Sequence, residues 1–282
     1  MSGGRNQLKK SNQTPKNQDD IFGRLGDFSA RTGQSIYINC KFVCRVLRAM
    51  YYMLRGRGDM RRVDLWVEID AAGLRAIPIV CLISFMIGLI IAFVGHMQLE
   101  MFGAEIYVAA LVAISMVRIV GAIMTGIIMA GRTGASYAAE IGSMRANDEI
   151  DALKTMGISP MEFLVLPRVI ALTITMPLLT IIADAVAILG GMCVAISIMN
   201  VSIAEYWQTT LNWISFKNFA VGVFHGWIFG WVIAITGCIC GLHAEKNATG
   251  IGRATTRAVV MAIVGCVVAT AILTLVFNWL EI

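Results

Sequence analysis

Long apolar stretches separated by short polar ones dominate the hydrophobic pattern of this chain. Four of them are unambiguous and cover residues 77–94, 106–130, 219–242 and 258–280. Each is long enough to cross the hydrocarbon core of a bilayer, about 30 Å thick, as an α-helix. The pattern therefore predicts an all-α polytopic membrane protein.

A fifth apolar stretch, residues 163–199, is ambiguous because it is too long for a simple crossing. At about 1.5 Å per residue it would reach roughly 55 Å as a single helix. It fits either one long helix, kinked at Pro167, Pro177 or the Gly190-Gly191 pair, or two separate spans.

The distribution of Lys and Arg decides between these two topologies. With one span, the chain before residue 77, residues 131–162 and residues 243–257 share one side and hold fourteen, three and three of the 23 basic residues. The loops on the opposite side then hold only Lys217. Basic residues gather in cytoplasmic loops. We therefore expect one span at 163–199 and five crossings in all, with the N-terminus on the cytoplasmic side and the C-terminus on the opposite side.

The chain before the first span divides into two parts. Residues 1–20 are polar and rich in lysine and asparagine, which indicates a disordered tail rather than a transit peptide or a cleavable signal peptide. Residues 21–76 form a cytoplasmic or interfacial region, in which residues 41–55 place apolar side chains on one helical face and basic ones on the other. Such a helix lies in the membrane interface, although an ordinary surface helix shows the same pattern. Residues 77–282 then form the five-span domain.

The longest charged interruption between spans runs from residue 130 to residue 160 and carries its own helix signals. Asn147 is a candidate N-cap for a short helix with an acidic first turn, and Gly157 is placed to end that helix. The sequence Ser-Pro-Met-Glu at 159–162 has the form of a capping box that opens the next span.

The short helix predicted here is amphipathic. Ile150, Leu153 and Met156 recur at helical spacing on one face, beside an acidic rim. An apolar stripe with such a rim suits the docking of a soluble partner. A solvated loop on the membrane surface explains the same residues equally well.

Composition narrows the possible functions. The chain is 57% apolar and only 15% charged, and no nucleic-acid recognition motif accompanies its basic residues, so nucleic acid is an unsuitable partner. The three histidines and seven cysteines show no metal-ligand spacing, and no catalytic set is visible, so we expect neither a metal nor a catalytic site. No phosphate-binding loop is present, so we expect no cofactor in this chain, and ATP would be bound by a partner subunit.

Two charged residues lie inside predicted spans. Arg118 is near the middle of the second span, and Asp184 is in the third. A buried arginine is costly in a bilayer and faces a cavity, a partner or a lipid headgroup. Arg118 therefore either contacts an anionic substrate or forms a structural pair with Asp184. For Asp184 the structural interpretation is favoured. Glycines at 222, 226 and 230 predict close helix packing in the fourth span.

The segment AGRTGASYAAEIGSMRANDEIDALKTMGISPMEFLVLPRVIA, residues 130–171, resembles the signature of MlaE-type permeases, the membrane subunits of MCE-associated ABC transporters of phospholipid. A second match precedes the last span, in the sequence GIGRATTRAVV at 250–260. The resemblance extends in order and spacing over roughly residues 40–280.

This resemblance implies a homodimer in the bacterial inner membrane, with an N-terminal interfacial helix and five spans in each chain. It implies a cytoplasmic ABC ATPase as partner, a hexamer of periplasmic MCE-domain proteins, a STAS-domain protein in some systems, and phospholipid as substrate. The segment at about 140–158 would be the coupling helix between spans two and three. Its expected ATPase-coupling residues are Glu140, Arg145, Asp148, Glu149, Ile150, Asp151, Leu153 and Met156.

One departure from the family pattern concerns the second span. Many members read Arg-Glu-Leu-Gly-Pro where this chain reads Arg118-Ile119-Val120-Gly121-Ala122. The role of that glutamate does not transfer to Ile119, and a lipid phosphate or Asp184 becomes the expected partner of Arg118, which with Asp184 marks the substrate pathway. The rival functions are a secondary carrier of a small solute, disfavoured by the scarcity of intramembrane acids, and a non-transporting membrane scaffold.

Overall fold

The computed structural model describes residues 41–51, 62–199 and 201–280 of the 282-residue chain. Residues 41–51 are helical, as predicted for the first part of the amphipathic segment. The remainder of that segment, residues 52–55, and the tail predicted at 1–20 lie outside the described residues.

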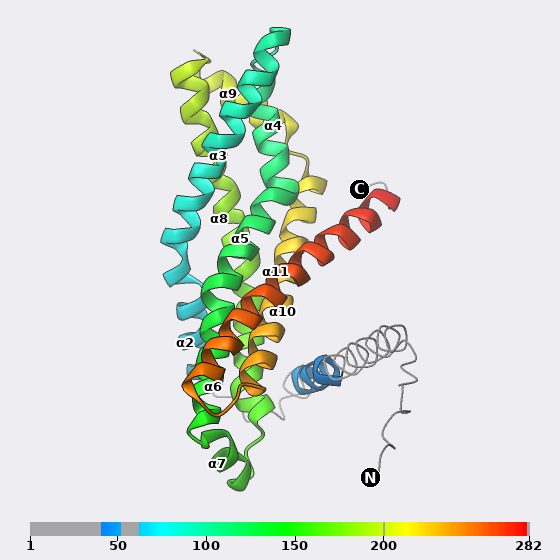
Figure 1. The fold of residues 1–282 in the computed structure, drawn as a ribbon. Coiled ribbons are helices and arrows are strands. Elements are labelled where there is room, and N and C mark those ends of the chain that lie inside the picture. Colours follow the sequence, from blue (N-terminus) through cyan, green and yellow to red (C-terminus); the bar gives the residue numbers. More distant parts are fainter. Residues whose placement is uncertain (1–40, 52–61, 200, 281–282) are drawn as a thin grey trace, which may run out of the picture. The chain divides into compact units, whose positions relative to one another are not determined.

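From residue 62 onward the described chain is a bundle of helices (Figure 1). The first elements are α2 (Arg62–Ala72), η1 (Leu74–Ala76), α3 (Ile77–Leu99), η2 (Glu100–Phe102), α4 (Tyr107–Ser115), η3 (Met116–Val120), α5 (Gly121–Met129) and η4 (Ala130–Gly134). The remaining elements are α6 (Ala135–Ala146), α7 (Glu149–Thr155), η5 (Met161–Val165), α8 (Leu166–Ile198), α9 (Ile203–Trp213), α10 (Phe216–Leu242) and α11 (Ala248–Trp279).

Several of these elements join into longer helices. Five helices in the described part of the chain are long and apolar enough to cross a membrane, at Val63–Phe102, Tyr107–Ala146, Met161–Ile198, Phe216–Leu242 and Ala248–Trp279. The prediction of an all-α polytopic membrane protein is therefore confirmed. The ambiguous stretch at 163–199 lies in one of them and is not split into two spans.

The third of these helices shows how packing overrides a local breaker. Pro177 lies inside α8 and cannot donate the backbone hydrogen bond that would reach the carbonyl of Thr173. The helix nevertheless continues to Ile198, because α3 and α10 both pack against it. Between α3 and α8 the contact is so close that a Cβ on Gly88 would overlap the carbonyl oxygen of Ala187.

The predicted glycine packing of the fourth span is also confirmed. A Cβ on Gly222 would overlap the carbonyl oxygen of Val117, and one on Gly230 would lie 2.6 Å from the carbonyl oxygen of Leu172. Glycine therefore lets α10 lie directly against the backbones of η3 and α8.

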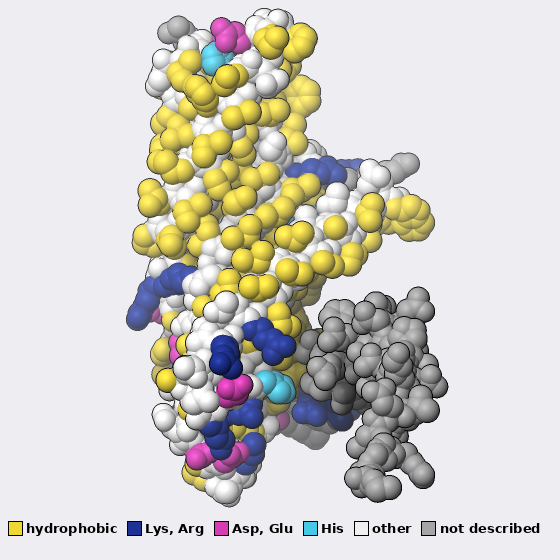
Figure 2. Space-filling model, in the orientation of Figure 1, with side chains coloured by type: hydrophobic (Ala, Val, Ile, Leu, Met, Phe, Trp, Pro, Cys, Tyr) yellow, Lys and Arg dark blue, Asp and Glu magenta, His cyan; other side chains and the backbone are white. Residues whose placement is uncertain are grey.

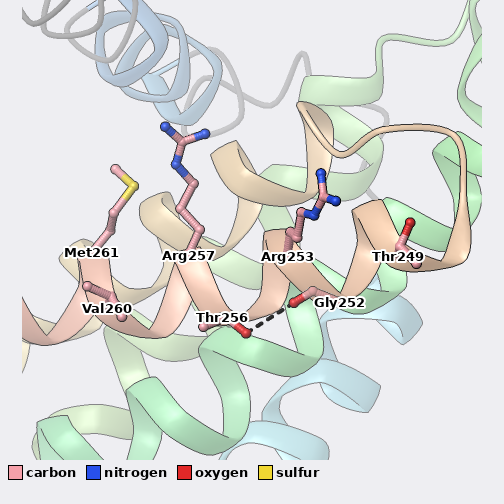
Figure 3. A pocket seen from close by; sticks show the side chains of 7 residues that line it. All are labelled: Thr249, Gly252, Arg253, Thr256, Arg257, Val260 and Met261. Carbon is pink, nitrogen blue, oxygen red and sulfur yellow. Dashed lines mark hydrogen bonds between the residues drawn. The ribbon is translucent and has the colours of Figure 1, made fainter.

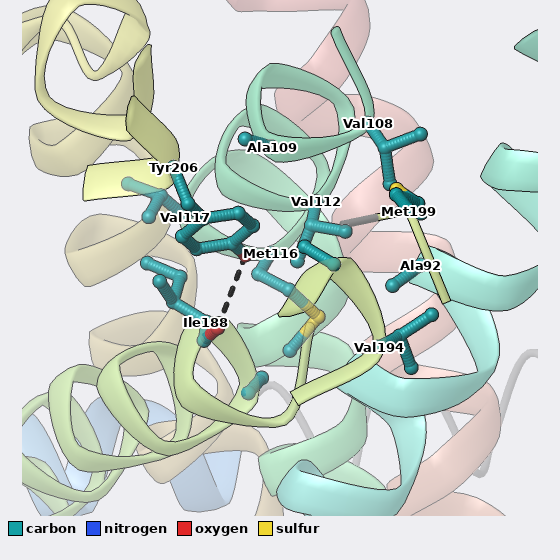
Figure 4. Close-up of a cluster of buried hydrophobic side chains, with 12 residues drawn as sticks. Ala92, Val108, Ala109, Val112, Met116, Val117, Ile188, Val194, Met199 and Tyr206 are labelled. Carbon is teal, nitrogen blue, oxygen red and sulfur yellow. Dashed lines mark hydrogen bonds between the residues drawn. The ribbon is translucent and has the colours of Figure 1, made fainter. Parts of the chain in front are cut away.

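A hydrophobic cluster joins α3, α4, α8 and α9 toward the α9 end of the bundle (Figure 4). Its centre contains Val112, Met116 and Tyr206, all of them fully or almost fully buried. The Tyr206 hydroxyl donates a hydrogen bond of 3.1 Å to the carbonyl oxygen of Ile188, which satisfies the polar atom of an otherwise apolar core. The short helix α9 is thereby held on the end of α8.

The two ends of the bundle differ in chemistry. Helices α6 and α7 lie at one end and α9 at the other (Figure 1). Most of the charged side chains visible in Figure 2 gather toward the α7 end, whereas hydrophobic side chains cover much of the rest of that face. This segregation matches the charge pattern of the sequence and fits a membrane-spanning body with one strongly polar end.

The second long helix departs from the boundaries predicted from hydropathy. The apolar stretch ends at residue 130, but the helix continues to Ala146 through the π-helical turn η4 and α6. Tertiary contacts explain the extension, because Ile141 is fully buried and Gly142 lies against Ala244 and Ile251. Residues 140–146 therefore belong to the stem of the second span, and the coupling helix predicted at 140–158 is divided.

Candidate functional site

The hairpin between α6 and α8 holds most of the predicted coupling residues. The short helix α7 begins at Glu149, and its N-cap is Asp148, which has a left-handed backbone with φ of 60°. Asn147 instead ends α6, so the predicted cap at Asn147 is wrong. The physical reason is the αL turn at Asp148, which separates α7 from the α6 stem. As a result, the first turn of α7 starts one residue later than predicted.

The other predicted helix signals of this hairpin have mixed outcomes. Gly157 has φ of +79° and follows α7, as the predicted stop requires. The capping box at 159–162 does not form. The carbonyl oxygen of Ser159 accepts hydrogen bonds from the backbone amides of Glu162 and Phe163, and no side chain caps the helix. Pro160 takes the cap position, so the turn is closed by backbone atoms instead of side chains.

The apolar stripe of α7 is only partly accessible. Ile150 is 5% exposed and Leu153 is half-buried, so these two side chains help to hold α7 against the chain itself. Met156 is 65% exposed, and Ile158, which the sequence pattern did not single out, is 39% exposed. The apolar surface that a partner could contact at this tip therefore consists of Met156 and Ile158.

The hairpin is braced by the loop between α10 and α11. Lys246 in that loop forms ion pairs with Asp148 and, at 3.5 Å, with Asp151. Arg145 in α6 donates a hydrogen bond to the carbonyl oxygen of Leu242, at the end of α10. Two loops that are about a hundred residues apart in sequence are thus joined by charge-assisted contacts. We call Asp148, Asp151 and Lys246 the Lys246 cluster.

The Lys246 cluster is solvated, and its electrostatics follow from its own charges. The hydrogen bond and positive charge of Lys154, followed by the hydrogen bond from Lys246, lower the pKa of the Asp151 carboxyl below its ordinary value. The hydrogen bond to Asp148 raises the pKa of the Lys246 ammonium above its ordinary value. Both groups therefore stay charged throughout the neutral range. Glu149, a predicted coupling residue, accepts a hydrogen bond of 3.3 Å from Asn147.

The start of α11 adds a basic face near this hairpin. Arg253 and Arg257 project from the same side of the helix, as Figure 3 shows, and Thr256 donates to the carbonyl oxygen of Gly252 within the helix backbone. Arg253 lies 3.8 Å from Glu245 of the preceding loop. Arg253, Thr256 and Arg257 belong to the second sequence match, GIGRATTRAVV. They lie in the first part of α11, whose N-cap is Asn247; the side chain of Asn247 accepts a hydrogen bond from the amide of Gly250.

A second charged group lies deeper in the bundle, and the sequence patterns did not reveal it. Arg168, at the start of α8, forms ion pairs with Glu68 of α2 at 3.3 Å and with Glu140 of α6 at 3.0 Å. The guanidinium carbon lies 5.4 Å from the centre of the Tyr137 ring. We call Glu68, Tyr137, Glu140 and Arg168 the Arg168 cluster. Glu140 was predicted as a coupling residue; Glu68 and Tyr137 were not assigned a role.

Arg118 lies in the π-helical turn η3, inside the second span. Its Nη1 donates a hydrogen bond of 2.7 Å to Oδ1 of Asn218, near the start of α10. A π-helical turn inside an α-helix is frequent at functional sites, because it turns side chains out of the regular register. The position of Arg118 in such a turn is a structural signal that hydropathy could not supply.

Asp184 lies in α8, inside the third of the five long apolar helices. Its side chain is 4% exposed and packs against the backbone of α5, where a Cβ on Gly121 would collide with Oδ1. Within the described part of the chain, Oδ1 accepts no hydrogen bond. Asp184 therefore packs tightly against α5, and its assignment to the substrate pathway or to a structural role stays a prediction.

Comparison with known proteins identifies the family of this chain. The family model described as Permease MlaE matches residues 65–276, which include nearly all of the bundle and both motifs. The chain belongs to the MlaE permease family. An MlaE permease is the membrane subunit of an ABC transporter, so this chain is a multi-pass membrane protein of that class.

Individual relatives agree with this MlaE assignment. A probable ABC transporter permease protein of Rickettsia typhi is 36% identical over 208 residues, covering 74% of this chain and 77% of the relative. The intermembrane phospholipid transport system permease protein MlaE of Haemophilus influenzae is 31% identical over 194 residues, covering 67% of this chain and 73% of the relative. The chloroplastic protein trigalactosyldiacylglycerol 1 of Arabidopsis thaliana is 25% identical, covering 67% of this chain and 54% of the relative.

Proposed function

We propose that this MlaE permease moves phospholipid between the bacterial inner membrane and a periplasmic MCE-domain protein, driven by a separate ATPase. Membership of the family supports the transporter class, and the name of the Haemophilus relative supports phospholipid as the substrate class. The permease would work as a homodimer with an MCE hexamer on its periplasmic side, and a STAS-domain protein would bind the ATPase. The chain itself would bind no cofactor.

The observation that carries this proposal is the form of the α7 end. A short helix projects from the bundle between two spans, is braced by the Lys246 cluster, and exposes Met156 and Ile158 at its tip. A braced helix with an exposed apolar tip can transmit force from a bound protein, whereas an unbraced loop would absorb it. We infer that the ATPase docks here and that the α7 end is cytoplasmic, which places the N-terminus in the cytoplasm and the C-terminus in the periplasm.

The substrate would meet the permease within the spans. We propose that Arg118 contacts the phosphate of the lipid headgroup, since a guanidinium binds phosphate through charge-assisted hydrogen bonds and Asn218 orients it from α10. An apolar groove between α8 and α10 is lined by Pro177, Phe219 and Val223 among others, and neither Arg118 nor Asn218 is one of its lining residues. Arg118 is therefore not part of that groove.

The test is co-purification of the full chain with its candidate ATPase and MCE neighbours, followed by mass spectrometry of bound lipid. The variant Met156→Asp/Ile158→Asp places charge on the exposed tip, and the matched control Leu211→Asp does so on α9, where Leu211 is 57% exposed. We expect the tip variant to lose the ATPase and the control to keep it. Absence of the ATPase from wild-type preparations would refute the ABC mechanism.

Lipid provides a separate readout in the same experiment. Wild-type complex should carry phospholipid, and Arg118→Ala should carry much less while still binding the ATPase. If Arg118→Ala retains its lipid, the proposed headgroup contact is wrong although the architecture stands.

A further inference from the structure

Arg168 joins three helices that the sequence places far apart. Its side chain is 9% exposed, and its guanidinium contacts Glu68 of α2 through Nε and Glu140 of α6 through Nη2. Its third nitrogen, Nη1, donates to the carbonyl oxygen of Leu164 at 2.9 Å. Nη1 and Nη2 donate hydrogen bonds, whereas Nε makes an ion-pair contact with Glu68 at 3.3 Å and no hydrogen bond within the described part of the chain. The partners come from α2, from α6 and from the turn before α8.

The geometry of this contact makes it stiff. A planar guanidinium that binds two carboxylates at once fixes their separation and direction, which a single point charge cannot do. The Tyr137 ring lies beside the guanidinium and shields it from water. Arg168 and Glu68 are largely removed from solvent, whereas the Glu140 side chain is 49% exposed. Separating Arg168 from Glu68 would therefore leave a buried charge without compensation.

Helix α2 has a second attachment to the same body. Arg132, in the π-helical turn η4 that precedes α6, donates a hydrogen bond of 3.1 Å to the carbonyl oxygen of Ala71, at the end of α2. The two arginines thus hold α2 at points three residues apart. The α6 stem, which carries the α7 hairpin, is therefore tied to α2, and α2 continues through η1 into the first span.

We propose that Arg168 is a positioning residue of the transport cycle, which carries displacement of the α6–α7 hairpin to α2 and so to the first span. The proposal rests on the proposed function, because the force is taken to come from an ATPase docked at α7. Its structural part, that the Arg168 cluster holds α2 to α6, stands independently of any ATPase.

The structural part is tested by hydrogen exchange of the full chain in lipid nanodiscs, without the ATPase. The variant Glu68→Gln removes the carboxylate through which α2 contacts Arg168. It should make the backbone amides of residues 62–72 exchange roughly tenfold faster, because local opening follows the loss of holding contacts. The matched control is Asp70→Asn, which is also on α2 and breaks an exposed ion pair with Arg75 of η1. It should leave that exchange unchanged. Unaltered exchange in Glu68→Gln would overturn the proposal.

The functional part is tested in the reconstituted complex by measuring lipid transferred per ATP hydrolysed. Glu68→Gln releases α2 but leaves Glu140 on Arg168, so the ATPase should still bind and hydrolyse ATP. The transfer ratio should fall roughly threefold or more, on the scale at which coupling residues act. A purely structural role predicts that transfer and hydrolysis fall together with an unchanged ratio, and that result would overturn the proposal.

The two proposals fail in different ways. If wild-type chain binds no ATPase, the proposed function fails while the hydrogen-exchange result still decides whether the Arg168 cluster holds α2. If the ATPase binds and Glu68→Gln couples like wild type, the function stands and the positioning role of Arg168 is rejected.

Discussion

Two groups of ion pairs serve the same end of this permease, and they differ in how much water reaches them. In the Arg168 cluster the central arginine is 9% exposed, the glutamate on α2 is 18% exposed and the glutamate on α6 is 49% exposed. In the Lys246 cluster the lysine is 48% exposed and its partners 56% and 66%. Each group joins elements distant in sequence. The difference shows that burial, not the number of ion pairs, determines how strongly each group holds together the helices that it joins.

The roles that follow are different. A buried group with fixed geometry resists separation and suits the transmission of movement between helices. A solvated group forms and breaks at little cost, so the Lys246 cluster orients the α7 hairpin, while the buried Ile150 and the hydrogen bond from Arg145 to Leu242 hold the hairpin in place. Four experiments test this contrast, beginning with the largest expected effect.

Removing the centre of the buried group should be the most damaging change. Arg168→Met leaves Glu68 and Glu140 facing each other without a cation, and we expect it to lower the free energy of unfolding by about 3–5 kcal/mol. Thermal unfolding in detergent measures the change. The triple variant that also carries Glu68→Gln and Glu140→Gln should recover part of the loss, since no buried charge is left unpaired. If Arg168→Met unfolds like wild type, the burial argument is wrong.

An intermediate effect is expected for Arg145, which is half-buried and donates to the Leu242 carbonyl oxygen. Arg145→Ala removes a charge-assisted hydrogen bond and should cost about 1–2 kcal/mol. Limited proteolysis should also cut the loop at 243–247 faster, because the hairpin no longer holds it. A cut rate equal to that of wild type would show that the Lys246 cluster holds the loop alone.

A smaller effect is expected for the exposed group. Lys246→Ala should shift the thermal unfolding midpoint by several-fold less than Arg168→Met, since solvent screens its two ion pairs. Raising the salt concentration should reduce the difference between wild type and Lys246→Ala but leave the Arg168→Met difference nearly unchanged. Equal salt sensitivity of the two variants would contradict the contrast.

The smallest effect concerns pH. The pKa of Asp151 is lowered from 3.8, so its contribution is fully present above that value and is lost as the pH falls through the depressed pKa. The pKa of Lys246 is raised from 10.5, so its contribution is present below that value and is lost as the pH rises through the elevated pKa. The difference between wild type and Lys246→Ala should therefore be flat across neutral pH. A change near neutrality, measured by thermal unfolding in buffers of graded pH, would show that other groups control it.

Local patterns predicted much of this fold, for clear reasons. A bilayer requires long apolar helices, so hydropathy located the spans. One side of the predicted topology holds only Lys217 and the other holds the basic loops, and this difference predicted a single span at 163–199. The spacing of Gly222, Gly226 and Gly230 predicted close packing, because small residues are the means by which helices approach in lipid.

Other features lay beyond local patterns. The extension of the second helix to Ala146 depends on α10 and the start of α11, which pack against α6 and bury Ile141 and Gly142 in a segment that hydropathy assigns to a loop. The αL turn at Asp148 moved the predicted cap, and the burial of Ile150 removed it from the accessible stripe. For the extension of α6, contacts made by distant segments overrode a local preference.

The sequence by itself determined the membrane class, the number of spans and the family, because these depend on composition, charge bias and motifs carried by contiguous residues. Only the tertiary structure decided which charges meet. Glu68, Glu140 and Arg168 are separated by long stretches of chain. From the sequence alone, each looks like an ordinary charged residue of a helix, and nothing indicates that the three form ion pairs. Their meeting depends on how α2, α6 and α8 pack, and packing is a property of surfaces that no single segment contains.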